Sequence, residues 1–212
     1  MSTPHIRQVY LRTCEASLEL LGHYGVARMW DGESMVPGFS LAGLAGHLGR
    51  STLQVEMFLD APEPTDEPIT AVEYYAQLVG VEDPDSELNV GVRARGEEVA
   101  ALGPSGLVVA VGEALARLRK RLPSEPDIRQ LSAFGRTLRL DDYLRTRLVE
   151  LTVHIDDLAL STDVEPPTVS EEAYREAIDV LVAVGRAKHG DVAVLRALTR
   201  RERDDVDALH IL

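Results

Sequence analysis

The sequence predicts an all-α protein: a four-helix bundle followed by a short, mainly helical C-terminal extension. Three observations support this prediction. Several stretches repeat apolar residues three and four positions apart, which is the period of an amphipathic helix. Capping residues, glycines and prolines mark where these stretches begin and end. Long polar or proline-containing segments connect them, as crossover loops do in helical bundles, and no internal repeat is visible.

Start and stop signals define the helices of the first half. Thr3 is a suitable N-cap, and Pro4 a suitable first residue, for the first helix. Ser40 is the predicted N-cap of the second. Prolines exclude a helix in the segment 61–68, so we expect a rigid loop there. The expected helices are, in order, 4–24, 40–59 and a short one at 71–78, with a polar loop reaching residue 87.

The second half contains three further bundle stretches, expected at about 88–102, 105–122 and 141–161. Gly103-Pro104 either separates the first two or kinks a single helix. We expect an irregular connection over 123–140. Asp141 is the predicted N-cap of the third stretch.

Pro166 and Pro167 mark the clearest boundary. We therefore expect a bundle over 1–165 and an extension over 166–212 that packs on it. Ser170 is the predicted N-cap of an amphipathic helix that Gly190 ends, and a short helix is expected over 191–200. Residues 208–212 form either a terminal strand or a frayed end. The side chains expected to face inward are Tyr174, Ile178, Leu181 and Val182.

Composition narrows the function classes. The chain has 212 residues, 35 acidic against 22 basic, and a formal charge of −13. A nucleic-acid or anionic-membrane surface would need a basic face, so neither partner is expected. Cys14 is the single cysteine, which excludes an internal disulfide and a cysteine-based zinc site. No signal peptide or membrane span is recognised, and we expect a cytoplasmic protein. The oligomeric state is left open.

Glu150 and His154 are the most informative pair of residues. They lie four positions apart on one predicted helix, with Cβ atoms about 5–6 Å apart, so both can contact one divalent metal ion. His47 is a third candidate ligand. Two His and one Glu would leave a position open on zinc, as in catalytic sites. A solvated or hydrogen-bonded pair is the alternative.

The helical phase places this pair beside the core. Leu144, Leu148, Leu151, Ile155 and Leu158 form one apolar stripe at about 100° per residue. The polar strip beside it consists of Tyr143, Arg147, Glu150, His154 and Asp157. On its own predicted helix His47 lies similarly beside the stripe, together with Gln54. Such strips line the interior of helical bundles, where metal sites are built.

Two segments and Trp30 carry a family resemblance. The segments are Val-Pro-Gly-Phe-Ser-Leu-Ala-Gly-Leu-Ala-Gly-His-Leu-Gly at 36–49 and Thr-Arg-Leu-Val-Glu-Leu-Thr-Val-His-Ile-Asp-Asp-Leu-Ala at 146–159. They resemble the DinB-like superfamily and, within it, the actinobacterial mycothiol-dependent maleylpyruvate isomerase family. The resemblance covers roughly residues 4–165. It implies a four-helix bundle whose divalent metal, Zn²⁺ by preference, is held by His47, Glu150 and His154.

The resemblance also implies a thiol-dependent reaction. The metal would bind the sulfur of mycothiol, a low-molecular-weight thiol, and favour its thiolate. The thiolate would attack a small electrophilic substrate, giving either transfer or isomerisation. Arg147 and Arg50 are the catalytic candidates, because either could pair with a substrate carboxylate. An ion pair of Arg147 with Glu150 or Asp142 is the structural alternative. Asp157 would orient a metal ligand or bind polar groups of the thiol.

One part of the family pattern is missing. The isomerase carries a small α/β domain after the bundle, and residues 166–212 do not match it, which argues against maleylpyruvate as the substrate and against isomerisation. A non-catalytic helical bundle that binds a small molecule or protein is the alternative function, and metal-dependent hydrolysis through a bound water is a third. Gly43, Gly46 and Gly49 on the second helix indicate either close helix packing or room for a ligand.

Overall fold

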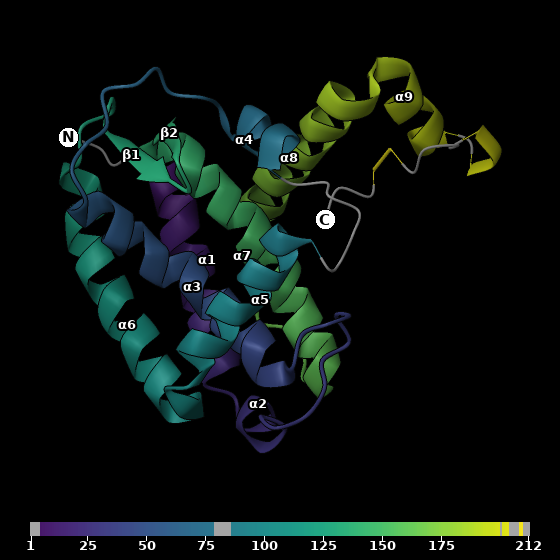
Figure 1. The fold of residues 1–212 in the computed structure, drawn as a ribbon. Coiled ribbons are helices and arrows are strands. Elements are labelled where there is room, and N and C mark those ends of the chain that lie inside the picture. The colour runs from purple at the N-terminus through teal and green to yellow at the C-terminus, as the bar shows by residue number, and fades with distance from the viewer. Residues whose placement is uncertain (1–4, 79–85, 200, 204–207, 210–212) are drawn as a thin grey trace.

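The computed structural model describes residues 5–78, 86–199, 201–203 and 208–209, and within these residues the fold is almost entirely helical (Figure 1). The helices of the first half are α1 (His5–Leu21), α2 (Tyr24–Arg28), α3 (Leu41–Asp60) and α4 (Ala71–Leu78). Those of the second half are α5 (Glu87–Ala100), α6 (Gly103–Arg121), α7 (Leu140–Thr162), α8 (Glu171–His189) and α9 (Asp191–Thr199). The all-α prediction is confirmed.

The bundle consists of α1, α3, α6 and α7. Helix α1 packs against α6 and α7, and α3 packs against the same two helices from the other side. Helix α5 covers α3, while α4 and α8 pack outside α7. In Figure 1 α6 lies at one side of the bundle, and α8 and α9 lie at the other. The apolar stripe predicted on α7 is fully in the core, since its five residues are at most 1 % exposed.

Several helix boundaries differ from those expected. Helix α1 ends at Leu21, and the short α2 follows, with the His23 side chain accepting a hydrogen bond from the Gly25 amide. The predicted cap at Thr3 and Pro4 lies outside the described residues. Ser40 caps α3 as predicted, through its hydroxyl and the Gly43 amide. Helices α5 and α6 are separate, because the chain turns by 96° between them.

The connection expected to be irregular over 123–140 contains a hairpin. Strands β1 (Gln130–Ala133) and β2 (Arg136–Arg139) pair antiparallel, with Leu131 opposite Leu138. Phe134 and Gly135 form the turn, both with positive φ, a conformation that glycine adopts without strain. Buried residues alternate along β1, as is typical of a strand, whereas the two central residues of β2 are both buried, and each strand has only four residues.

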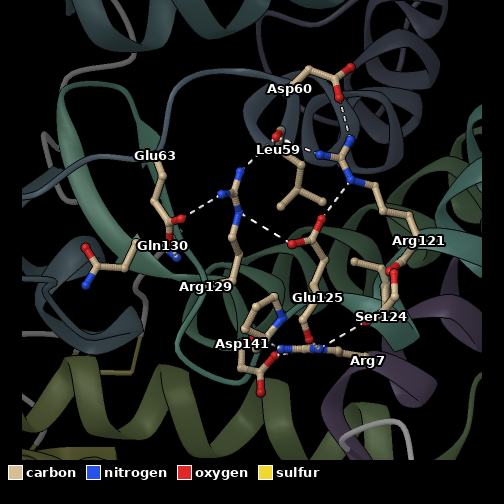
Figure 2. A network of polar contacts seen from close by, with 12 residues as sticks. Arg7, Leu59, Asp60, Glu63, Arg121, Ser124, Glu125, Arg129, Gln130 and Asp141 are labelled. Atoms are coloured by element: carbon tan, nitrogen blue, oxygen red, sulfur yellow. Dashed lines mark hydrogen bonds and ion pairs between the residues drawn. The ribbon is translucent and has the colours of Figure 1, made fainter.

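The prediction that Asp141 caps α7 was wrong. Arg139 holds the N-cap position without a side-chain hydrogen bond, and Asp141 lies in the first turn of the helix. Its carboxylate instead accepts a hydrogen bond from Arg7 Nε at 2.7 Å. The fully buried Arg7 also donates to the carbonyls of Leu122, Glu125 and Pro126. Figure 2 shows Arg7 between Asp141 and Glu125. The Asp141 carboxylate therefore binds the distant Arg7 and not the helix N-terminus, and Arg7 connects α1 to the segment that follows α6.

The C-terminal helix α8 is capped by Ser170 as predicted, and Leu181 packs against the core as expected, but the prediction was wrong for two other residues of its inward face. Tyr174 is 43 % and Ile178 is 56 % exposed, whereas small residues next to them in phase are buried. Small side chains let α8 approach α4 and α7 closely, so they displace the larger ones from the contact. The buried residues are Ala173, Ala177, Val180, Val184 and Gly185.

Helix α9 follows Gly190 and agrees with the expected short helix. Ala208 and Leu209 form a turn, and the rest of the predicted terminal strand lies outside the described residues. The division into 1–165 and 166–212 stays a prediction. Across the described part of the chain, no helix by itself has the length and apolarity to cross a bilayer; α5 and α6 reach that length and composition only as a bent pair.

Candidate metal centre

Two antiparallel helices bring the three predicted ligands together. Helix α3 carries His47, and α7 carries Glu150 and His154. His47 Nε2 lies 3.0 Å from Glu150 Oε2, and His154 Nε2 lies 3.4 Å from the same oxygen. The two imidazole rings meet edge to face at a centroid distance of 4.7 Å. Residues over a hundred positions apart thus share one small polar site within the bundle.

The donor set fits a tetrahedral metal ion. The three ligand atoms lie within 4.8 Å of one another. Ligands bound tetrahedrally to zinc at about 2.0–2.1 Å are about 3.3–3.4 Å apart, which is close to both distances around Glu150 Oε2. Each side chain is 13–14 % exposed, so the donors are largely shielded from bulk water while the site stays reachable.

The neighbours of these side chains fix their orientation. His154 Nδ1 lies 2.9 Å from Asp157 Oδ2, one turn further along α7. The Tyr75 hydroxyl, from α4, lies 2.9 Å from Glu150 Oε1 and 3.0 Å from the Thr146 carbonyl. Oε2 of Glu150 is therefore left to face the two histidines. Hydrogen-bonded groups behind metal ligands commonly set their orientation in this way.

Burial and charge act differently on the three ligands. Burial would raise the pKa of Glu150, but hydrogen bonds from His154 and His47 outweigh it, and the pKa lies well below its ordinary value. Burial would lower the pKa of His154, but hydrogen bonds to Asp157 and Glu150 raise it to about 9. Burial lowers the pKa of His47. Without an ion, the cluster therefore holds an ionised Glu150 beside a protonated His154.

Both candidate arginines are buried near the centre. Arg147 is 6 % exposed, and its Nη2 lies 4.0 Å from Glu150 Oε1. Asp142 pairs with Arg145 instead, at 3.6 Å, so of the two acids considered for Arg147 only Glu150 is near it. Arg50 is 9 % exposed and contacts Gln54. The polar strip predicted on α7 therefore begins inside the bundle, with Tyr143 and Arg147 buried, and reaches the partly exposed Asp157.

The glycines of α3 serve close helix packing. A Cβ added at Gly49 would lie 2.8 Å from Leu107 Cδ1 of α6. At Gly46 it would overlap the Gly96 carbonyl of α5, and at Gly43 the Glu97 carboxylate. Of the two interpretations of these residues, helix packing therefore holds. Helices α5 and α6 occupy the space that a ligand would need at these positions.

Two residues of the site were not singled out from the sequence. Tyr75 lies on α4, a helix with no motif that points to the metal centre. Arg95 lies on α5, and its charge acts on Arg50. Neither has a regular sequence spacing to a ligand, because both reach the site through packing between distant helices. The aromatic pair Tyr74-Tyr75, buried on a short helix, was the available signal for the first.

The fold and the site together define a class: a helical bundle with a His/Glu/His cluster between two of its helices. Residues 11–159 match the family described as mycothiol maleylpyruvate isomerase N-terminal domain. The chain belongs to this family, and the resemblance inferred from its two motif regions is confirmed. Membership supports a mycothiol-related, metal-binding function. Comparisons with curated proteins and with solved structures give no match.

Proposed function

We propose that this protein is a metal-dependent enzyme that uses a low-molecular-weight thiol, mycothiol, in a transfer or isomerisation reaction on a small electrophilic substrate. The observation that carries the proposal is the convergence of two imidazole nitrogens and one carboxylate oxygen within 4.8 Å. Family membership supports mycothiol as the thiol.

His47, Glu150 and His154 would hold a divalent ion, and the nitrogen-rich donor set favours Zn²⁺. When bound, the ion would lower the pKa of a coordinated thiol and so supply thiolate at neutral pH. Three protein donors are the number that leaves a position for a further ligand in catalytic zinc sites.

The chain's own residues prepare the donors. Asp157 accepts a hydrogen bond from Nδ1–H of His154, so when an ion displaces the proton of Nε2, the lone pair of this nitrogen lies on the side of Glu150. Tyr75 occupies Glu150 Oε1 and turns Oε2 toward the histidines. Arg147, 4.0 Å from Oε1, helps to keep the carboxylate ionised. The buried charges of Arg147 and Arg50 are available to orient an anionic substrate beside the thiolate.

The reaction is proposed only as transfer or isomerisation, without maleylpyruvate as the substrate. The described residues after Pro167 form helices α8 and α9 and a short 3₁₀ turn. None of them corresponds to the α/β domain that contributes to the substrate site of the isomerase.

Metal content and thiol binding test the proposal. Protein purified without chelators should contain about one equivalent of zinc or another divalent ion, and His154→Ala should lose it. His5→Ala, at an exposed position on α1, is the matched control and should keep the metal. Calorimetry should detect mycothiol binding to the metal-loaded protein only. A metal-free preparation that cannot be loaded would refute the proposal, and metal-independent thiol binding would favour a non-catalytic binding protein.

A further inference from the structure

A cluster of three arginines lies one helical turn from the metal centre. Arg50 follows His47 by three residues on α3, and Arg147 precedes Glu150 by three residues on α7. Because α3 and α7 are antiparallel, both steps run in the same direction, by about 4.5 Å along the bundle. Arg95 approaches from α5, close enough for its charge to act on Arg50. We call Arg50, Arg95 and Arg147 the arginine cluster.

The cluster has more hydrogen-bond donors than acceptors. The buried Gln54 amide lies between Arg50 and Arg147. Its oxygen can face Arg147 Nη1 at 3.5 Å or, with the amide turned over, Arg50 Nε at 3.2 Å. One oxygen cannot be turned both ways, and the amide nitrogen is itself a donor. In either orientation one guanidinium therefore lacks this acceptor.

Two further donors, one in the arginine cluster and one beside it, lack an acceptor among the described residues. Arg95 Nε is buried without a hydrogen-bond partner there, and its guanidinium lies 5.2 Å from the ring centroid of Phe134. The hydroxyl of the fully buried Tyr143 also has no partner. Arg147 lies 5.0 Å over the ring of Tyr143. Buried donors are normally satisfied, so this concentration of free ones beside a candidate catalytic centre indicates a ligand.

The charges of the cluster are also incompletely balanced. Glu150 lies 4.0 Å from Arg147, but it is also in contact with His47 and His154. The exposed Glu98 offers Arg50 only weak compensation. Burial, and then the charge of Arg95, lower the pKa of Arg50 to about 10. Buried cations are normally paired, and an anion placed here would complete the pairing.

We propose that Arg50 and Arg95, together with the Tyr143 hydroxyl, form a subsite for a carboxylate group of the substrate. This proposal extends the proposed function and depends on it, because the bound carboxylate belongs to a substrate only if the protein is an enzyme. A guanidinium presents parallel N–H donors that match the two oxygens of a carboxylate. Burial raises the pKa of Tyr143, so its hydroxyl remains a neutral donor. The subsite lies about one helical turn from the metal ligands. A substrate that reaches both must therefore be a small acid whose electrophilic carbon lies near its carboxylate.

Binding of a simple dicarboxylate tests the subsite. Succinate is titrated calorimetrically into the metal-loaded full-length protein, with the uncharged diamide succinamide and inorganic phosphate as comparison ligands. We expect succinate to bind, succinamide not to bind, and phosphate to bind more weakly. Hydrogen bonds to a charged partner contribute about 1.5–3 kcal/mol, so Arg95→Gln and Arg50→Gln should each weaken succinate binding at least about tenfold.

Arg119→Gln is the matched control. Arg119 is a half-exposed arginine of α6 paired with Glu15, away from the cluster, and its replacement should leave succinate binding unchanged. Arg95 is less buried than Arg50, so Arg95→Gln tests the subsite even if Arg50→Gln fails to fold. Both folded variants should keep their metal, because neither residue is a ligand.

The outcomes separate this proposal from the proposed function. Loss of succinate binding in Arg95→Gln with unchanged metal content and mycothiol binding supports the subsite. Absent succinate binding, equal binding by Arg95→Gln and wild type, or tighter binding of phosphate than of succinate overturns it, while metal and thiol binding still stand. If the protein holds no metal, the proposed function fails. Titration of succinate into the same metal-free protein then tests the anion site by itself.

Discussion

The contact between α3 and α5 depends on glycine, and Gly96→Ala tests this dependence. A Cβ at Gly96 would lie 2.5 Å from the Gly43 carbonyl oxygen, whereas ordinary contact begins at 3.4 Å. The difference of 0.9 Å must come from separating two helix backbones, because no flexible side chain can give way. Overpacking costs about 1–3 kcal/mol. The higher helix propensity of alanine offsets about 1 kcal/mol of this cost, so we expect a net destabilisation of about 1 kcal/mol, and of about 2 kcal/mol at most.

Gly112→Ala is the internal control. Its Cβ would lie 3.6 Å from Leu18 Cδ2, an ordinary contact with a side chain. Only the propensity gain then applies, and we expect stabilisation by about 1 kcal/mol. The same substitution on two helices of one protein should therefore change the free energy of unfolding in opposite directions. Urea denaturation, followed by circular dichroism, measures both changes from the shift of the midpoint at constant slope.

The result that would refute this reasoning is specific. If Gly96→Ala stabilises the protein as much as Gly112→Ala does, α5 does not pack on α3 as closely as described. The same result would remove the physical reason for glycine at Gly43 and Gly46. Gly96 also places the added methyl 3.5 Å from His47 Cβ, so a crystal structure of the variant would show whether the ligand helix moves.

Three further predictions concern the site and the core. The pKa of His154 is raised to about 9 without metal, and only the neutral imidazole binds an ion. Binding of zinc below pH 9 must therefore displace a proton from His154. Zinc affinity, measured in competition titrations, should rise about tenfold per pH unit between pH 6 and 8 and level off near pH 9. An affinity that does not change with pH would contradict this prediction. Asp157→Asn should weaken zinc binding about 10–100-fold, whereas Asp156→Asn, at the exposed neighbouring position, should not, as measured with a chelating indicator. Burial raises the pKa of Cys14 to about 12, so a thiol reagent at pH 8 should modify it only after unfolding, and rapid labelling of the native protein would disprove its burial.

Local sequence patterns accounted for most of the helices. The hydroxyls of Ser40 and Ser170 cap helices where predicted, because N-capping involves only residues close in sequence. The hairpin was missed because each strand has only four residues, too few for a clear alternation. Asp141 failed as a cap because Arg7, from the other end of the chain, takes its carboxylate.

The sequence by itself determined which side chains share a face of one helix. Glu150, His154 and Asp157 follow from the helical period, and the family resemblance added His47. Only the tertiary structure decided what meets across helices: the approach of His47 to Glu150, the Tyr75 hydroxyl behind that carboxylate, and Arg95 beside Arg50. The physical reason is that the backbone fixes spacing within a helix, whereas the rotation and separation of two helices depend on all the side chains packed between them.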